Sequence, residues 1–384
     1  MKRFAFTFLL YLSPLICYTL ICEYYFFVDK ETVGVDKVVQ GQLKSKRETY
    51  YFRSFFNNSP SLYKLKMAQK KNADILIIGQ STVLQFRDVM FHPFESSFYN
   101  MGFSINNMND LESLLHYIKT GKLHKPKLII LGLDVSLIKK TLYINPDNEI
   151  LNPHCDEVSY PKYHAMASQL FIKAQLSKKT VDGLPNRHLG FGYLGERGTG
   201  FRRDGSMHYA GDIEKFIKDP VFRDPGNYKK LLDDKDYIFT EPYEIDQALL
   251  KRLLIDLKLL KQNGTEVTVF IPPISDDFYS YFATNKKFNA FFNDYLGIQS
   301  SLADDGIDVI NFTTPKGIGL SDIYMLDGIH PGEVFTGRLL YEHIAKSKQK
   351  GLLSKVDTGY LKKLILSKTT IPLSFMRDTS VFSY

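Results

Sequence analysis

A serine and an aspartate-histidine pair stand in two distant parts of the chain, and each has the surroundings that serine-based acyl transfer requires. Ser81 follows an apolar run and one further residue, Gln80. Asp327 precedes His330 by three positions in a loop that contains glycine and proline. A serine hydroxyl is a weak nucleophile until a base takes its proton, and a histidine base needs a carboxylate to hold its tautomer and orientation. That loop therefore supplies both candidate partners for Ser81.

Short apolar runs and longer amphipathic segments are the elements that would position these residues. The runs predict strands at 74–79, 98–100, 127–133, 266–271 and 308–312. Leucine and isoleucine at helical spacing predict helices at 109–120 and 245–263. This alternation predicts an α/β fold with a mainly parallel, helix-flanked sheet. Sites in such sheets gather at the carboxyl ends of strands, which is where the sequence places Ser81, Gly102, Asp134 and His330.

The order of these motifs resembles the SGNH/GDSL hydrolase superfamily over roughly residues 72–135 and 245–345. Ser81 matches the nucleophile of its block I, Gly102 the glycine of block II, and Asp327 and His330 the acid and base of block V. The resemblance implies a flavodoxin-like three-layer sandwich. It also implies that the backbone amides of Ser81 and Gly102 hold the oxyanion. Outside the resemblance, Gly102 reads as the glycine of a tight turn after a short strand.

The chain departs from the family pattern in two places. Gly79-Gln80-Ser81 stands where block I usually has Gly-Asp-Ser, and the changed residue is not the nucleophile. Asp134 stands where block III has the asparagine that donates to the oxyanion. An ionised Asp134 would repel a developing oxyanion, so we expect that donor to come from elsewhere, with Asn106 or Asn107 as candidates. Each motif alone also occurs in ordinary turns, which leaves a purely structural role open.

The first 28 residues predict a membrane anchor. Lys2 and Arg3 precede a run from Phe4 to Val28 in which Glu23 is the only charge, and such a helix is long enough to span a bilayer. A cleavable signal peptide is the alternative, but no suitable cleavage site precedes Glu23. Basic residues lie on both sides of the span and leave its orientation undecided. The family resemblance favours a domain outside the cytoplasm.

The rest of the chain divides into a stem, a main domain and a tail. Residues 29–71 show no sustained period and predict a stem, 72–348 the α/β domain, and 349–384 a tail that could lie on the bilayer or pack. An insertion at about 140–240 is expected to cover the site and shape a substrate groove.

Within the insertion, Gly190 to Gly195 match the dinucleotide fingerprint in letters only, because no strand precedes them and no helix follows. We therefore expect a glycine-rich loop and no cofactor. Arg202 or Arg203 could contact an anionic or sugar substrate, or could simply be solvated. The residues His154, Cys155 and His164 lack a metal-ligand spacing, so no metal is expected.

The charge of the chain indicates which partners to expect, and its cysteines indicate whether the domain has a disulfide. The net charge is +7, with a denser basic stretch at Lys64, Lys66, Lys70 and Lys71. This stretch predicts a solvated stem near the membrane, with attraction to anionic lipid or polymer as the alternative. No nucleic-acid motif accompanies the charge, so nucleic acid is not an expected partner. Two of the three cysteines lie in the apolar span, which leaves no disulfide within the domain.

Three functions remain open at this point. The resemblance implies a membrane-anchored, extracytoplasmic partner of a membrane-bound O-acyltransferase, which would acylate a cell-envelope polymer such as alginate, peptidoglycan or teichoic acid. An envelope carbohydrate esterase would use the same Ser81, His330 and Asp327 with water as the final acceptor. A non-catalytic binding or assembly module on the same scaffold is the third possibility, and Asp134 keeps it open.

Overall fold

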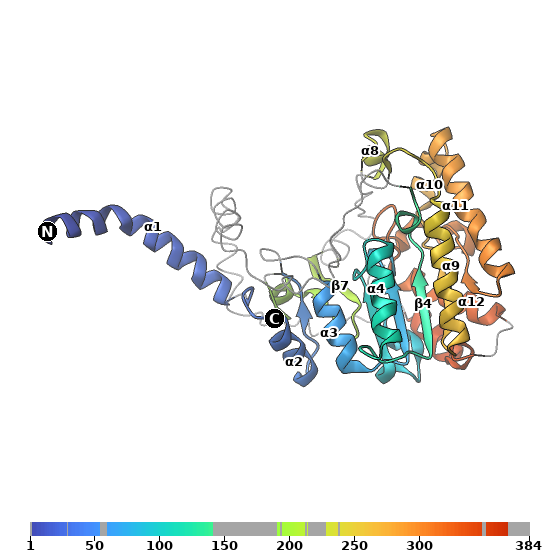
Figure 1. Ribbon diagram of the computed structural model, residues 1–384, viewed down its shortest axis with the longest axis horizontal. Coiled ribbons are helices and arrows are strands. Elements are labelled where there is room, and N and C mark those ends of the chain that lie inside the picture. Colours follow the sequence, from blue (N-terminus) through green and yellow to red (C-terminus); the bar gives the residue numbers. More distant parts are fainter. Residues whose placement is uncertain are drawn as a thin grey trace. The chain divides into compact units, whose positions relative to one another are not determined.

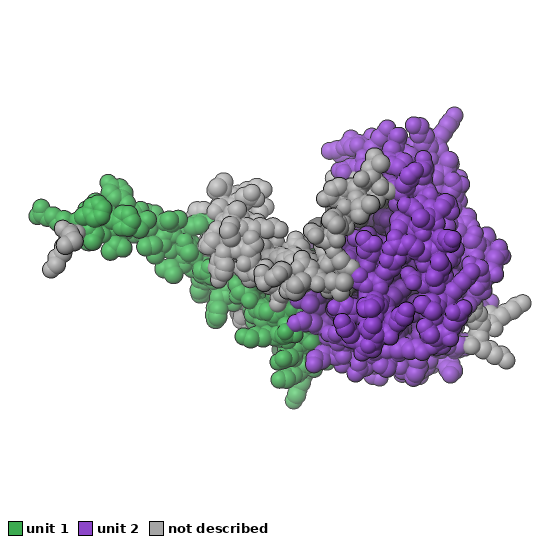
Figure 2. Space-filling view, in the orientation of Figure 1, with its two compact units in different colours: residues 1–59, 153–203 green, residues 60–152, 204–384 purple. Residues whose placement is uncertain are grey.

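The structure is a computed structural model, and it describes residues 2–28, 30–53, 60–140, 190–192, 194–211, 213, 228–236, 239–347 and 351–367. The chain divides into two compact units, which Figure 2 shows in different colours. Unit 1 comprises residues 1–59 and 153–203, and unit 2 comprises residues 60–152 and 204–384. Both units draw on two separate stretches of the chain.

A five-stranded parallel sheet forms the centre of unit 2. Its strands are β2 (Ile75–Gly79), β3 (Phe98–Gly102), β4 (Leu128–Gly132), β8 (Glu266–Phe270) and β9 (Asp308–Ile310). They lie in the order β3-β2-β4-β8-β9. Numbered along the chain this order is 2-1-3-4-5, the order of flavodoxin-type doubly wound sheets. All five expected strands are confirmed, with ends within two residues of the prediction.

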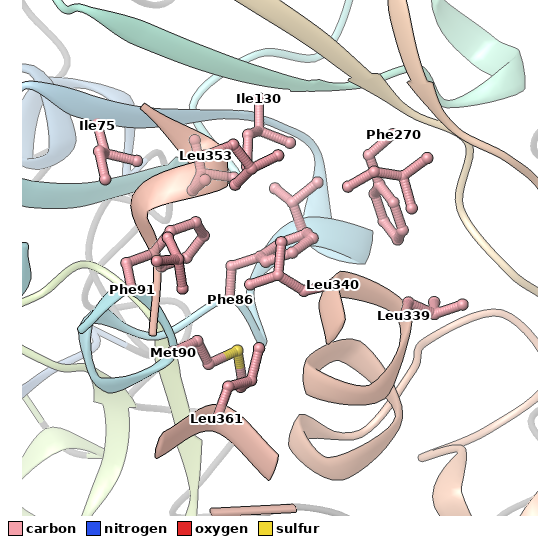
Figure 3. Packing of buried hydrophobic residues seen from close by; sticks show 14 of the residues in the cluster. Ile75, Phe86, Met90, Phe91, Ile130, Phe270, Leu339, Leu340, Leu353 and Leu361 are labelled. Carbon is pink, nitrogen blue, oxygen red and sulfur yellow. The ribbon is translucent and has the colours of Figure 1, made fainter. Parts of the chain in front are cut away.

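Both faces of this sheet are buried, which is why its strands are continuous apolar runs rather than alternating ones. On one face, Ile75, Ile130 and Phe270 belong to a core cluster that also contains residues of α12 (Glu333–Lys346) and α13 (Thr358–Leu366), as Figure 3 shows. The strand residues that point the other way are equally buried, among them Leu76, Ile78, Ile129 and Leu131. Protein therefore covers the sheet on both sides.

Two of the covering helices were expected from their leucine spacing. They are α4 (Met108–Lys119) and α9 (Gln247–Gln262), which appear on either side of β4 in the view of Figure 1. Arg252 joins them, because its Nε donates to Glu112 Oε1 at 2.7 Å. Ile245 is not part of α9; it pairs with Lys139 in an isolated bridge. Two helices that follow β8, α10 (Asp276–Phe282) and α11 (Lys286–Asp304), were not expected.

The stretch 29–71, expected to be a stem without a sustained period, contains two helices. This stretch holds α2 (Val35–Lys44) in unit 1 and α3 (Ser61–Lys71) in unit 2. Polar residues at core positions hide the helical period: Gln42 and Lys64 are both fully buried. Lys64 is thus not solvated, and its Nζ donates to the Asn100 carbonyl at 3.0 Å.

A small sheet holds the described part of unit 1 together. β1 (Tyr50–Tyr51) pairs in parallel with β5 (Gly190–Phe191) and antiparallel with β6 (Thr199–Phe201). The glycine-rich segment expected as a loop therefore contains strands. Its first glycine is needed for close pairing, because a Cβ on Gly190 would lie 1.9 Å from the carbonyl oxygen of Tyr50.

The two ends of the described chain differ in their surroundings. The helix α1 (Lys2–Val28) contains a span, Arg3–Ile21, that is exposed, and long and apolar enough to cross a membrane; a signal sequence has the same properties. Near the other end, Leu361 and Leu364 of α13 are buried in the core cluster. The described part of the expected tail, 351–367, therefore packs against the domain.

Candidate active site

The structure brings Ser81, His330 and Asp327 into one chain of hydrogen bonds within unit 2. Ser81 Oγ lies 2.7 Å from His330 Nε2, although 249 positions separate the two residues in the sequence. On the other side of the ring, His330 Nδ1 lies 2.8 Å from Asp327 Oδ2 and 3.0 Å from Oδ1. This geometry allows the imidazole to take the serine proton while the carboxylate fixes the tautomer of the ring.

A short 3₁₀ turn, η1 (Ser81–Val83), presents the serine directly beyond β2. Val83 anchors this turn, and three glycines at the ends of adjacent strands make room for its side chain. A Cβ added to Gly79, Gly102 or Gly132 would lie 2.9, 2.8 or 2.3 Å from a methyl carbon of Val83. Gly102 is therefore required by this close approach, and its backbone is not in the left-handed region.

Gln80, the residue that departs from the Gly-Asp-Ser pattern, braces the turn from both sides. Its Oε1 accepts from the Ser136 hydroxyl at 3.0 Å, and its Nε2 donates to the carbonyl of Asn106 at 3.1 Å. Ser136 follows β4 and Asn106 follows β3. One side chain thus ties the serine turn to the loops after both neighbouring strands.

The loop that carries the base is organised by the same carboxylate that orients it. Asp327 Oδ1 accepts from the backbone amides of Ile329 and His330, both at 2.9 Å. The loop is closed by the Leu326 amide, which donates to the His330 carbonyl at 2.9 Å. The acid and the base are therefore fixed relative to each other before any substrate binds.

A buried ion pair connects the serine segment with the helix that follows this loop. Arg87 Nη1 lies 3.3 Å from Glu333 Oε2, and Glu333 is the first residue of α12. The Glu333 side chain is completely buried. Loss of one partner would leave an unpaired charge in the core, so replacing either residue alone would destabilise the fold.

The charges of the site favour a protonated imidazole. Burial alone would lower the pKa of His330, but the charge of Asp327, its hydrogen bond and the charge of Asp134 outweigh burial and raise the pKa above the usual value. Burial alone would likewise raise the pKa of Asp327, yet the charge and hydrogen bond of His330 and two backbone amides hold it below the usual value. The pair is thus arranged to stabilise the imidazolium that forms when Ser81 is deprotonated.

Asp134 is the second carboxylate that acts on His330. It is half-buried, and its Oδ2 and Oδ1 accept from the Thr82 hydroxyl at 2.9 and 3.1 Å. Burial raises the pKa of Asp134 to about 6, although the Thr82 hydrogen bond, the charge of His330 and the Gln80 amide act in the opposite direction. Asp134 therefore changes its charge in the same pH range in which an ordinary histidine does.

The candidate oxyanion donors have partners of their own. The Gly102 amide donates to Asn100 Oδ1 at 2.6 Å, and this bond would have to be exchanged before the amide could bind an oxyanion. Asn107 Oδ1 accepts from the Asp110 amide at 3.1 Å and caps α4. Asn106 is exposed, and its backbone amide donates to Asp110 Oδ2 at 2.9 Å. The oxyanion roles of these residues stay predictions.

The structure does not place the remaining sequence-based candidates in the unit-2 site. Arg202 and Arg203 belong to unit 1, whereas the triad belongs to unit 2. Arg202 is 3% exposed, and Arg203 Nη2 donates to the Arg47 carbonyl at 3.5 Å. The three residues weighed as metal ligands, His154, Cys155 and His164, lie outside the described residues, as does most of the expected insertion.

Sequence reasoning missed two features beside the triad. Tyr228, on α8 (Tyr228–Asp233), places its hydroxyl 3.5 Å from His330 Nδ1. A cavity of about 50 Å³ is lined by Thr82, Asp134, Ile329 and a group of aromatic side chains. Its aromatic residues come mainly from α10 and α11, and their repeated phenylalanines were the available signal.

No protein-family model, curated protein or solved structure matches this chain.

Proposed function

We propose that this protein is a serine acyl-transfer enzyme with Ser81 as nucleophile, His330 as general base and Asp327 as the residue that orients the base. The observation that carries the proposal is the hydrogen-bond chain from Ser81 Oγ through His330 to Asp327, with distances of 2.7 and 2.8 Å. Its members come from a strand end and from a separately braced loop. Packing alone does not require this arrangement, in which the Ser81 hydroxyl contacts Nε2 of His330 while Asp327 holds Nδ1.

The reaction would proceed in two steps. Ser81 Oγ attacks the carbonyl carbon of an ester or thioester while its proton passes to His330 Nε2. The tetrahedral intermediate collapses to an acyl-serine, and His330 gives the proton to the leaving oxygen or sulfur. A hydroxyl of the acceptor then attacks the acyl-serine with His330 again as the base, and Ser81 leaves with the proton. Asp327 holds Nδ1 throughout and stabilises the imidazolium.

The oxyanion would be held by amides at the start of the serine turn. The Ser81 amide begins a 3₁₀ turn and has no acceptor within it. The Gly102 amide joins it if the substrate oxygen replaces Asn100 Oδ1. The protonated form of Asp134 is compatible with a negative oxygen nearby, whereas its charged form is not.

The combination of this triad with a 2-1-3-4-5 parallel sheet supports assignment to the SGNH/GDSL type of hydrolase, with a three-layer core and a large insertion. The apolar span in α1 supports a single-pass anchor. The resemblance to the SGNH/GDSL family favours a catalytic domain outside the cytoplasm. Together they support a role as the partner of a membrane-bound O-acyltransferase that acylates an envelope polymer. An envelope esterase with water as the acceptor is the nearest alternative.

One observation favours a non-catalytic binding or assembly module instead. Asp134 occupies the position of the family's oxyanion asparagine and accepts a hydrogen bond from Thr82 rather than donating one to a substrate. A module of this kind would retain Ser81 and His330 as a polar binding surface. It would show no covalent acyl intermediate.

Product analysis with the full-length protein in detergent tests the proposal. The protein is incubated with an activated ester, with and without an acetylatable polysaccharide, and both free acid and acylated polymer are measured. We expect turnover, and Ser81→Ala should lower it by at least about a thousandfold, because neither partner of the triad works alone. Ser113→Ala, on α4, is the control and should retain the wild-type rate. Turnover by Ser81→Ala at the wild-type rate would remove the enzyme proposal, and acid without acylated polymer would favour the esterase.

A further inference from the structure

The aromatic cavity beside the triad is placed by the same segments that carry the catalytic residues. Its lining includes Thr82, which follows Ser81, and Ile329, which precedes His330. Asp134, which bonds Thr82, lines it as well. The cavity therefore adjoins both the serine turn and the histidine loop.

The opposite wall is a rigid group of rings. Six aromatic side chains contribute to the lining: Phe239, Phe278, Phe282, Phe288, Phe292 and Tyr295. Phe282 packs edge-on against Phe278, Phe288 and Phe292, with ring centroids 5.7, 5.3 and 4.7 Å apart. Such contacts fix the positions of the rings, so the cavity keeps its shape without an occupant.

The hydroxyl groups of the lining donate hydrogen bonds within the protein. The Thr82 hydroxyl donates to Asp134, and the Tyr295 hydroxyl donates to the Leu133 carbonyl. A sugar or a charged group in this cavity would lose hydrogen bonds to water and gain few in return. A hydrocarbon group would lose none. The chemistry of the lining therefore selects an apolar occupant.

We propose that this cavity binds the hydrocarbon part of the acyl group that Ser81 carries, and that it limits the acyl group to a short chain. The inference rests on the proposed acyl transfer and adds its substrate class: short-chain aliphatic esters or thioesters. A volume of about 50 Å³ exceeds the about 10–15 Å³ that a cavity needs to hold one water, so the cavity can take a small group but not a long chain. This matches acyl groups of about two to four carbons.

A chain-length series on the full-length protein tests the inference. The esters run from acetyl to octanoyl with the same leaving group, and kcat/KM is measured for each. We expect the rate to fall about tenfold for each methylene beyond the fourth carbon, because the rigid wall cannot accommodate it. Phe292→Leu enlarges the cavity and should raise the ratio of hexanoyl to butanoyl ester rates about tenfold.

The chain offers a matched control on the same helix. Phe291 is buried like Phe292 but does not line the cavity. Phe291→Leu should therefore leave the ratio within about twofold of wild type, while costing similar stability. A wild-type rate that is insensitive to chain length, or an equal change of the ratio in both variants, would overturn the pocket and leave acyl transfer standing.

Binding without catalysis separates the two proposals. Ser81→Ala protein should bind butanoate more tightly than octanoate in ligand-observed NMR, and Ile274→Phe, which fills the cavity, should abolish butanoate binding. Absence of any ester turnover together with selective butanoate binding would sink acyl transfer but retain a short-chain apolar site. Butanoate binding that Ile274→Phe leaves unchanged would overturn the pocket, whatever the enzymatic result.

Discussion

Two aspartates act on His330 in different ways. The pKa of Asp327 is held below its usual value, so this carboxylate is charged at neutral pH. The pKa of Asp134 is raised to about 6, so its charge appears only as the pH rises through that value. The charge of Asp134 in turn raises the pKa of His330. Asp134 therefore favours the imidazolium form of His330 and opposes the free base that the proposed reaction needs.

Replacing Asp134 by asparagine should change both activity and stability with pH. Because the negative charge is gone, the pKa of His330 falls and the rising limb of the pH-rate profile moves to lower pH. The amide also provides a donor near the oxyanion, so the rate at neutral pH should be preserved or raised. The profile of kcat/KM against pH measures both effects. A profile that does not move, or moves to higher pH, contradicts this account of Asp134.

The stability effect has a definite sign. The folded-state pKa of Asp134 lies near 6, above the ordinary value of 3.8, so the protonated form stabilises the fold and this contribution is lost as the pH rises from about 4 to 6. Asp134→Asn removes the loss and should raise the unfolding free energy at pH 7.5 by about 1–3 kcal/mol. Urea unfolding at pH 4 and 7.5 measures it. Asp294→Asn, at an exposed position, is the control and should show no such gain.

The residues of the candidate triad were predictable because their signals are local. Ser81 ends an apolar run, and Asp327 and His330 share one loop, so each half could be recognised without knowledge of the rest. The hydrogen bonds of Gln80 and the bond between the Gly102 amide and Asn100 could not be predicted. Their roles depend on Ser136, Asn106 and Asn100, which only the folded sheet brings into contact.

The strand ends show how elements position Ser81, the proposed nucleophile. β2, β3 and β4 each end in a glycine, and Val83 of the serine turn occupies the space that three side chains would fill. Glycine at these positions is a matter of packing rather than of backbone conformation. Any side chain there displaces Val83 and, with it, the turn that carries Ser81.

Gly132→Ala should therefore lower stability and activity, and Val83→Ala in the same chain should partly restore both. The new Cβ would lie 2.3 Å from Val83 Cγ1, so the turn must shift; we expect a loss of about 1–3 kcal/mol of stability and a lower rate of ester turnover. Val83→Ala in the same chain removes the clash and should restore part of both, which a double-mutant cycle measures.

The control for this cycle is Gly297→Ala. Gly297 lies in α11 with no atom within 4 Å of its added Cβ, so alanine should be neutral or stabilise by about 0.5–1 kcal/mol. A Gly132→Ala protein as stable and active as wild type would show that Val83 does not fix the turn.

Elements were predictable where their residues were uniformly apolar. The five strands follow that pattern and were placed to within two residues. The helices α2 and α3 were missed because Gln42 and Lys64 occupy core positions and use their polar ends on backbone carbonyls. The sequence does carry a signal for α11, because Phe288, Phe292 and Tyr295 recur at helical spacing.

At the scale of the whole molecule, the division into two units could not be predicted from the sequence. Unit 1 joins residues near 50 with residues near 190, as the pairing of Tyr50 with Gly190 shows. Such a pairing depends on contacts between residues far apart in the sequence, which no local sequence pattern predicts. The expected insertion and stem are thus partly one body in the fold.

The span in α1 leads to a prediction about the mature protein. If Arg3–Ile21 is a retained anchor, the protein should stay in the membrane pellet after carbonate washing, and mass spectrometry should recover peptides from residues 2–28. A protein lacking residues 2–28 should leave the pellet. A mature amino terminus beyond residue 20 would identify the span as a cleaved signal sequence instead.

Active-site labelling tests the central claim most directly. The full-length protein is treated with an alkyl fluorophosphonate, and the modified peptide is identified by mass spectrometry. The account predicts one adduct, on Ser81, that forms far more slowly in His330→Ala and is absent in Ser81→Ala, because the hydroxyl is nucleophilic only when the imidazole takes its proton. A folded wild-type protein that forms no adduct on Ser81, or labels equally fast without His330, would contradict it.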